Sequence, residues 1–236
     1  MPNPSPQHNR TGRPPRISLL EILAAAHAVI DADGVEKLTM RRLATELACT
    51  PMALYHHVHD KEDLLRLLLN DYADQVVWPA LPDAPRERIL VAANAMHEVL
   101  AARSWIVEVL VSDDLFGVSA LWINETIIDA AIASGLGPDR AVQAYRVIWH
   151  YTAGDLIVRA KSERRAAENR PTYRESVFAD LDPDTLPRLS ALGPRWVELT
   201  AVDTYEYGLR ALVDGLLAGS ESRQPGVLPG CSSDAG

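Results

Sequence analysis

Cysteine is scarce in this chain of 236 residues, and long apolar runs are missing. The only two cysteines are Cys49 and Cys231, so we expect no disulfide framework, and a reducing cytoplasm fits the composition. No segment reaches the roughly 18 uninterrupted apolar residues of a membrane span, and the polar N-terminus lacks the apolar core of a signal peptide. We therefore expect a cytoplasmic protein that does not bind a membrane.

Positive charge is also in short supply, because 23 lysines and arginines face 32 acidic residues and the formal net charge is −9. A nucleic-acid binder gains most of its affinity from phosphate contacts, so here its positive charge would have to be concentrated locally. Residues 1–17 contain no acidic residue and are expected to be disordered. They form a basic arm that could place Arg13 and Arg16 in a DNA minor groove. The alternative is a solvated tail.

Hydrophobic residues make up 47% of the chain, enough for one large core or for one large and one small core. Their spacing is helical, which predicts an all-α protein. The first helix begins at Ser18, which forms a capping box with Glu21, and ends at Asp33-Gly34. Another begins at Asp60-Lys61 and continues to about Val77. Later helices are predicted at 85–102, 104–112, 116–134, 139–165 and 195–218, with a long mobile loop at 161–190 and a disordered tail at 220–236.

Between the first two of these helices, the sequence predicts a pair of shorter ones joined by a tight turn. Thr39 caps the first, in which Leu43 and Leu47 share one face. Thr50 caps the second, which begins at Pro51 and is too short to be stable alone. This is the pattern of a helix-turn-helix, whose second helix enters the DNA major groove. An ordinary corner between two helices would have the same pattern.

Two runs of residues distinguish between these possibilities. Asp33–Ala44 contains the pattern T-x-R-x-L-A, and Leu54–Leu65 contains L-Y-x-H-V-x-x-K-x-x-L-L. At this spacing and this near the N-terminus, they resemble the tetracycline-repressor (TetR) family of bacterial transcription regulators. The C-terminal part is similar to the tetracycline-repressor branch of that family, so the resemblance covers most of the chain.

The resemblance implies a three-helix helix-turn-helix domain at residues 18–64, linked by helix 61–77, and a larger helical domain at 65–219 that binds a ligand and dimerises. Within the larger domain, 141–159 and 204–217 are similar to the family's dimer helices. The implied function is a dimeric repressor that binds palindromic, double-stranded operator DNA and is released by a small molecule. A DNA-binding regulator without a small-molecule effector, acting through protein partners, is the alternative.

The outward side chains of the second short helix are expected to meet base edges, whereas Leu54 and Val58 are expected to point into the domain. Met52 and Ala53 offer only apolar contact, for example to thymine methyl groups, so sequence preference would also depend on DNA shape. The residues expected at base edges are Thr50, Pro51, Met52, Ala53, Tyr55 and His56.

The resemblance also assigns roles outside that helix. Arg41 matches a base-contacting arginine, and arginine paired with guanine is the commonest specific contact. Other interpretations stay open, because Tyr55 could be a core aromatic and the histidines could be surface residues. His56, His57 and His59 do not converge on one point of a helix, so no metal site and no cofactor is expected. The residues similar to the family's phosphate contacts are Thr39, Tyr55, His57 and Lys61.

All five tryptophans lie in the predicted second domain, together with isolated polar groups on apolar helices. A mostly apolar pocket with a few polar groups is typical of a small-molecule site. The tetracycline repressor holds its drug through a metal bound partly by a histidine in the segment that corresponds to Trp105–Leu110, which has none here. We therefore expect a bulky, apolar or aromatic metabolite or drug. The candidate residues, each of which could instead belong to the core or the dimer interface, are Met96, Trp105, Trp122, Glu125, Arg146, Trp149, His150 and Asp155.

An enzyme is not expected. The sequence contains no nucleophile elbow, no Gly-rich phosphate loop and no spaced set of metal ligands.

Overall fold

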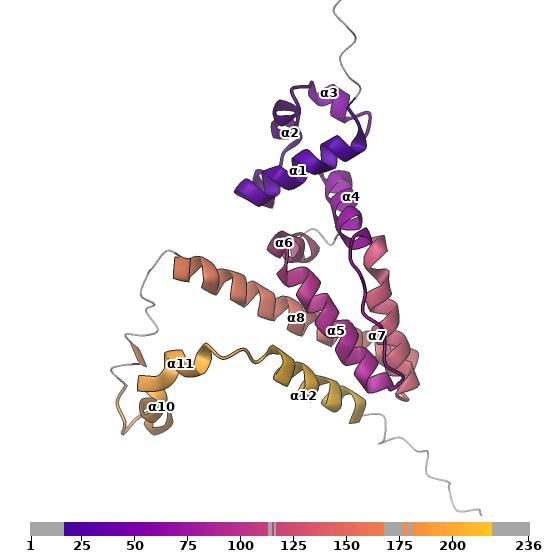
Figure 1. The fold of residues 1–236 in the computed structure, drawn as a ribbon. Helices are drawn as coiled ribbons and strands as arrows, with labels where there is room; N and C mark the ends of the chain where they lie inside the picture. The colour runs from indigo at the N-terminus through magenta and orange to yellow at the C-terminus, as the bar shows by residue number, and fades with distance from the viewer. Residues whose placement is uncertain (1–16, 113–114, 116, 168–176, 179–180, 219–236) are drawn as a thin grey trace, which may run out of the picture. The chain divides into compact units, whose positions relative to one another are not determined.

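Figure 1 shows the computed structural model of the chain, in which every regular element of the described residues is a helix. The predicted all-α fold is therefore confirmed. The chain divides into two compact units, residues 1–71 and 72–236, and the division lies inside helix α4 (Lys61–Asp74). Within the described part, no helix is both long enough and apolar enough to cross a membrane. The described residues are 17–112, 115, 117–167, 177–178 and 181–218.

The N-terminal unit is built around α1, which begins and ends as its sequence predicts. The Ser18 hydroxyl accepts a hydrogen bond from the Glu21 N–H, and the Glu21 carboxylate accepts one from the Ser18 N–H at 2.7 Å. At the other end, Gly34 adopts a φ of +88°, which favours glycine and stops the helix. The elements of this unit are α1 (Leu19–Asp33), the 3₁₀ turn η1 (Val35–Lys37), α2 (Met40–Glu46), α3 (Pro51–Leu54) and the first part of α4.

Each short helix of this unit starts on a side-chain cap. The Thr39 hydroxyl accepts from the Arg42 N–H at 3.1 Å, and the Thr50 hydroxyl accepts from the Ala53 N–H at 3.4 Å. At the start of α4, Asp60 accepts from the Asp63 N–H at 2.8 Å. Because α3 is a single turn, its position depends on burial, and Leu43, Leu54, Val58 and Leu64 are fully buried.

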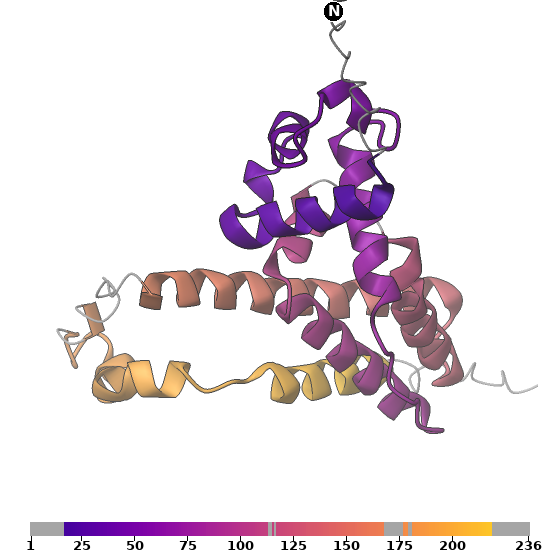
Figure 2. The same cartoon turned by 45° about the horizontal axis from the view of Figure 1, so that its top comes forward.

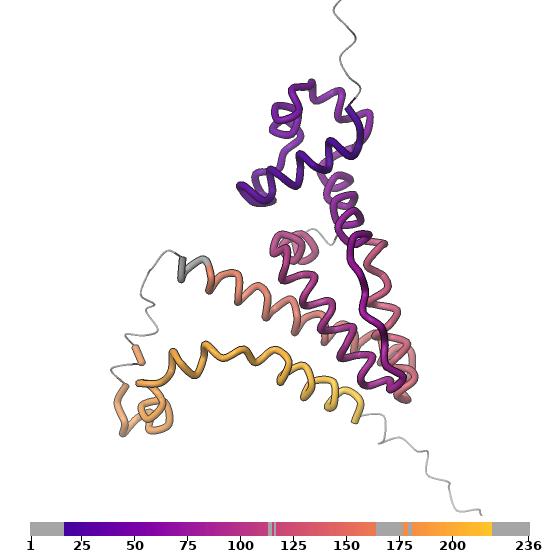
Figure 3. Tube along the Cα trace, viewed as in Figure 1, coloured from indigo at the N-terminus to yellow at the C-terminus, as the bar shows by residue number. Residues whose placement is uncertain are grey.

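The C-terminal unit is a bundle in which α5 packs against α7 and α8, and α8 packs against α6 and α12. The two views in Figures 1 and 2 agree that α8 and α12 run side by side, and the trace in Figure 3 shows that they run in opposite directions. The elements are α5 (Pro85–Ala101), α6 (Ser104–Ser112), η2 (Val118–Ala120), α7 (Leu121–Ala133), α8 (Pro138–Ala167), α10 (Pro187–Leu192), η3 (Gly193–Arg195), α11 (Trp196–Thr200) and α12 (Tyr205–Ala218).

The largest departure from the predicted helices is at the C-terminus, where the helix expected at 195–218 is divided into α11 and α12. The Asp203 carboxylate accepts a hydrogen bond from the Tyr205 N–H at 2.9 Å. It therefore satisfies the first backbone N–H of α12, in the middle of the apolar pattern. The periodicity of the apolar residues continues across this break, so it does not reveal it.

Other boundaries move by smaller amounts. Helix α4 ends at Asp74 rather than near Val77, five residues before Pro79. The predicted loop at 161–190 starts late, because α8 continues to Ala167. The remainder of that loop falls partly outside the described residues, as do the predicted tail at 220–236 and all but the last residue of the predicted arm at 1–17.

Candidate functional sites

The first candidate site is the exposed surface of α2, α3 and the turn between them, here called the reading surface. Met52 is 68% exposed and Tyr55 is 45% exposed, so Tyr55 is not a core aromatic. Leu54 and Val58 are fully buried, as predicted. Of the other residues predicted to contact DNA, Ala53 is half-buried, Arg13 and Arg16 lie outside the described residues, and the rest are exposed: Thr39, Arg41, Thr50, Pro51, His56, His57 and Lys61.

The two adjacent arginines of α2 differ in their contacts. Arg42 lies 2.5 Å from a carboxylate oxygen of Asp33 and 3.6 Å from one of Glu46. The guanidinium of Arg41 makes no hydrogen bond or ion pair with any residue that the structure describes. The fixed Arg42 therefore supports the domain, and Arg41 keeps its donors available for another molecule.

The second candidate site is a cavity of about 160 Å³ in the C-terminal unit. Its apolar wall comes from the end of α5, from α6 and from the second half of α8, and a few polar side chains complete it. Six of the eleven lining residues are apolar and four are charged, so a ligand in this cavity would meet both kinds of surface. The residues that line it are Leu100, Ala101, Ser104, Val107, Glu108, Leu156, Ile157, Arg159, Ala160, Lys161 and Glu163. A shallower groove of about 300 Å³ lies between residues 76–79 and α5.

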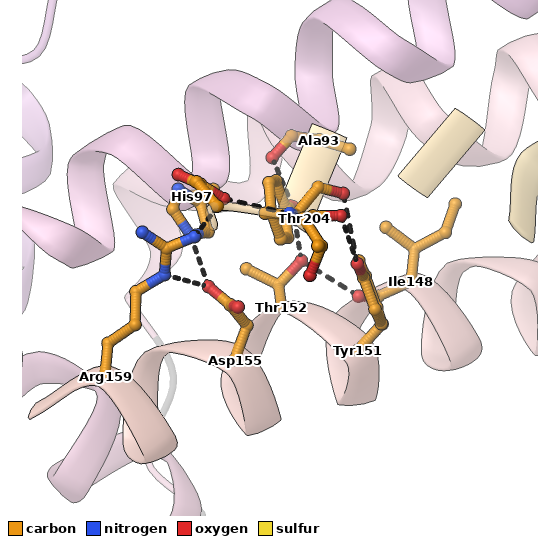
Figure 4. A network of polar contacts seen from close by, with 10 residues as sticks. Ala93, His97, Ile148, Tyr151, Thr152, Asp155, Arg159 and Thr204 are labelled. Atoms are coloured by element: carbon orange, nitrogen blue, oxygen red, sulfur yellow. Dashed lines mark hydrogen bonds and ion pairs between the residues drawn. The ribbon is translucent and has the colours of Figure 1, made fainter. Parts of the chain in front are cut away.

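A polar network joins this cavity to α12 (Figure 4). Arg159, on the cavity wall, donates through Nε to Asp155 at 2.7 Å and through Nη2 to Asp203. His97 Nε2 lies 2.9 Å from the same Asp155 carboxylate, and its ring stacks on Tyr205 with 3.8 Å between ring centroids. The hydrogen bond from Arg159 lowers the pKa of Asp203. The cavity and the start of α12 therefore share one guanidinium.

Tyr205 is the buried centre of the contact between α8 and α12. Its hydroxyl lies 2.8 Å from the hydroxyl of Thr152 and 3.3 Å from the carbonyl oxygen of Ala93. Burial raises the pKa of Tyr205 to about 12, so the hydroxyl stays neutral and donates a hydrogen bond. The two helices approach closely at Gly208, where any β-carbon would overlap the hydroxyl of Tyr151.

Comparison with known proteins identifies both units. Residues 22–68 match the family described as bacterial regulatory proteins, tetR family, and residues 78–219 match the tetracyclin repressor-like, C-terminal domain. The chain belongs to the TetR family. It is 28% identical over 215 residues to the HTH-type transcriptional repressor DrrR1 of Streptomyces coeruleorubidus, covering 87% of this chain and 79% of the relative. It is 27% identical over 215 residues to the tetracycline repressor protein class G of Vibrio anguillarum, covering 88% of this chain and 95% of that one.

Solved structures share this fold. ActR of Streptomyces coelicolor in complex with actinorhodin superposes with a TM-score of 0.72 at 21% identity, covering 88% of this chain and 99% of ActR. BioQ of Mycobacterium smegmatis with its double-stranded DNA operator superposes with a TM-score of 0.60 at 25% identity, covering 86% and 99% of the two chains. The resemblance inferred from sequence is confirmed, and the protein is a transcriptional regulator.

The residues predicted to bind the effector of this TetR-family regulator do not gather at one place. Trp122 stacks on Trp78 with 4.9 Å between ring centroids. Asp155 does not line the cavity but bonds Arg159, which does. None of the predicted residues lines the cavity itself, so their role in ligand binding stays a prediction. Met96 and Trp105 are buried, Trp149 is half-buried, and Glu125, Arg146 and His150 are exposed.

Sequence reasoning missed the residues that do line the cavity. Ser104, Val107 and Glu108 share one face of α6, which their spacing in the sequence could have indicated. Arg159 gives a second signal, since it is a charged residue in a helix whose neighbours are apolar. Neither signal shows which other helices line the cavity together with α6 and Arg159.

Proposed function

We propose that this regulator is a dimeric repressor without catalytic activity, which binds palindromic operator DNA in the cytoplasm and is released by a small apolar or aromatic molecule. The observation that carries the proposal is the reading surface, where Arg41 is exposed and its guanidinium makes no hydrogen bond or ion pair with the described part of its own domain. The double-stranded operator in the BioQ structure supports the same class of DNA partner.

On the operator, α3 lies in the major groove and Arg41 pairs with guanine, whose O6 and N7 accept two hydrogen bonds from one guanidinium. Met52 contacts the methyl group of a thymine. The residues that resemble the family's phosphate contacts hold the phosphate backbone, which fixes the register of α3 in the groove. They are Thr39, Tyr55, His57 and Lys61.

The dimer forms through α8 and α12. Both helices leave large apolar side chains exposed, among them Val142, Val147 and Val158 on α8 and Tyr207, which is 79% exposed, on α12. Because the two helices lie side by side in one protomer, two protomers related by a twofold axis can bury all four helices together. Operator palindromes reflect that symmetry.

The effector occupies the cavity between α5, α6 and α8. Helix α4 spans the division between the two units, so it is the covalent route by which occupancy of the cavity changes the spacing of the two reading surfaces. Half-sites lie at a fixed spacing, so a shift of a few ångströms costs the contacts of one half.

Fluorescence anisotropy with a labelled palindromic fragment from the protein's own gene neighbourhood tests this function. Wild type should bind it specifically, with an affinity that falls steeply as salt increases. Arg41→Ala should bind the fragment about tenfold or more less tightly per half-site, whereas Arg188→Ala, which removes an exposed arginine from α10, should bind as wild type does. Specific binding that is insensitive to salt, or that is equally tight in Arg41→Ala, would contradict the proposal.

A further inference from the structure

Arg159 belongs both to the cavity wall and to the network that fixes the start of α12. Its Nε bonds Asp155 and its Nη2 bonds Asp203. Within the described residues, no carboxylate bonds the remaining nitrogen, Nη1. A guanidinium has five N–H donors and remains charged at any physiological pH, so Arg159 can donate hydrogen bonds to an anion that enters the cavity.

The two carboxylates that bond Arg159 differ in how readily another anion would displace them. The Asp155 side chain is 21% exposed and is also held by His97, whereas the Asp203 side chain is 62% exposed. Asp203 does not line the cavity. A competing anion would therefore displace Asp203 first, and Asp203 is also the residue that caps α12 through the Tyr205 N–H.

Building on the proposed function, we infer that the effector is an apolar molecule with one anionic group, such as a carboxylate, and that this group takes Arg159 from Asp203. The apolar part rests on Leu100, Val107 and Leu156. Lys161, on the same wall, adds positive charge, whereas Glu108 and Glu163 oppose it.

This competition gives the effector a route to the dimer helices. When the anion holds Arg159, Asp203 loses its partner and the first turn of α12 is less firmly tied to α8. Thermodynamic linkage requires the reverse effect as well: removing the charge of Asp203 must strengthen binding of an anion in the cavity. That reverse effect can be measured before the natural effector is identified.

The experiment uses two small probes of the same shape, 2-naphthoate and its neutral amide, 2-naphthamide, titrated into the full-length protein by ligand-observed NMR. Asp203→Asn should bind 2-naphthoate about three- to fivefold more tightly than wild type, the range expected for one partly exposed charge pair. Its affinity for 2-naphthamide should not change. Arg159→Gln should bind both probes alike.

Asp214→Asn is the matched control. Asp214 also lies on α12 and also pairs with an arginine of another helix, because Arg86 of α5 donates to it at 2.6 Å. Arg86 does not line the cavity, so this variant removes a contact of α12 without changing the cavity wall and should bind both probes as wild type does. If Arg159→Gln unfolds, Arg159→Lys should still prefer 2-naphthoate.

Three results would overturn the inference: no binding of either probe, equal affinity of wild type and Asp203→Asn for 2-naphthoate, or the same gain in Asp214→Asn. The operator-binding test is independent of these titrations. A protein that binds its operator but shows no link between Asp203 and the anionic probe would therefore keep its proposed function and lose this effector class.

Discussion

Met52 provides a test of how α3 reads bases. The helix has no arginine, lysine, asparagine or glutamine between Thr50 and His57, so it lacks the side chains that pair bidentately with bases. Met52 is 68% exposed, and leaving a thioether chain of this size in water is unfavourable unless a partner buries it. In the major groove, the apolar partner is the C5-methyl group of thymine.

Replacing that thymine by uracil removes the methyl group and nothing else. One buried methyl is worth about 0.8 kcal/mol, so a palindrome changed in both half-sites should lose about 1.6 kcal/mol, or roughly 15-fold in affinity. In anisotropy titrations, uracil is placed at each thymine position in turn. Wild type should show this loss of affinity at one of these positions. Met52→Ala should bind the thymine and uracil duplexes equally.

Leu20→Ala is the control, because Leu20 is 75% exposed but lies on α1. It should keep the full sensitivity to uracil. If Met52→Ala lost affinity on uracil duplexes as wild type does, or if wild type were insensitive at every position, Met52 would have no role in reading thymine.

Three further outcomes follow from contacts in the two units. Arg41→Ala should lose about tenfold or more in affinity per half-site and relax selection for one guanine, whereas Arg42→Ala should keep sequence preference and lower the free energy of unfolding by at most about 1 kcal/mol. Ala48→Gly should raise the free energy of urea unfolding by about 1 kcal/mol, since Ala48 adopts a φ of +48° that glycine tolerates better. Arginine partners lower the pKa of both Asp203 and Asp214 in the folded state. The two ion pairs therefore stabilise the fold above the unfolded pKa of the carboxylates, and this stabilisation is lost as the pH falls. Wild type should lose more free energy of unfolding between about pH 5 and pH 2 than Asp203→Asn or Asp214→Asn does.

The N-terminal unit could be predicted closely because its signals are local. Ser18, Thr39, Thr50 and Asp60 each cap a helix by accepting from the backbone N–H three residues ahead. A cap of this kind depends on residue types at fixed short spacing, which a single sequence displays. Leu54 and Val58 likewise follow from helical periodicity, and both are buried as expected.

The cavity could not be predicted in the same way, because its polar contacts join distant parts of the chain. His97 and Asp155 are 58 residues apart, and Arg159 and Asp203 are 44 apart. Periodicity shows which face of α8 carries Asp155 and Arg159, but it does not show which helix covers that face. The predicted ligand residues were chosen for being polar or aromatic on apolar helices, a description that also fits exposed residues such as His150 and Arg146.

Asp203 illustrates the consequence for regulators of this family. In the sequence it stands in Ala201-Val202-Asp203-Thr204, which belongs to no motif and lies within a continuous apolar pattern. In the structure, its carboxylate accepts hydrogen bonds from the Tyr205 N–H at the start of α12 and from Arg159 on the cavity wall. A substitution here would leave every family motif intact and change both contacts at once. Differences in effector response between related regulators can therefore arise from residues that neither touch the ligand nor belong to the reading surface.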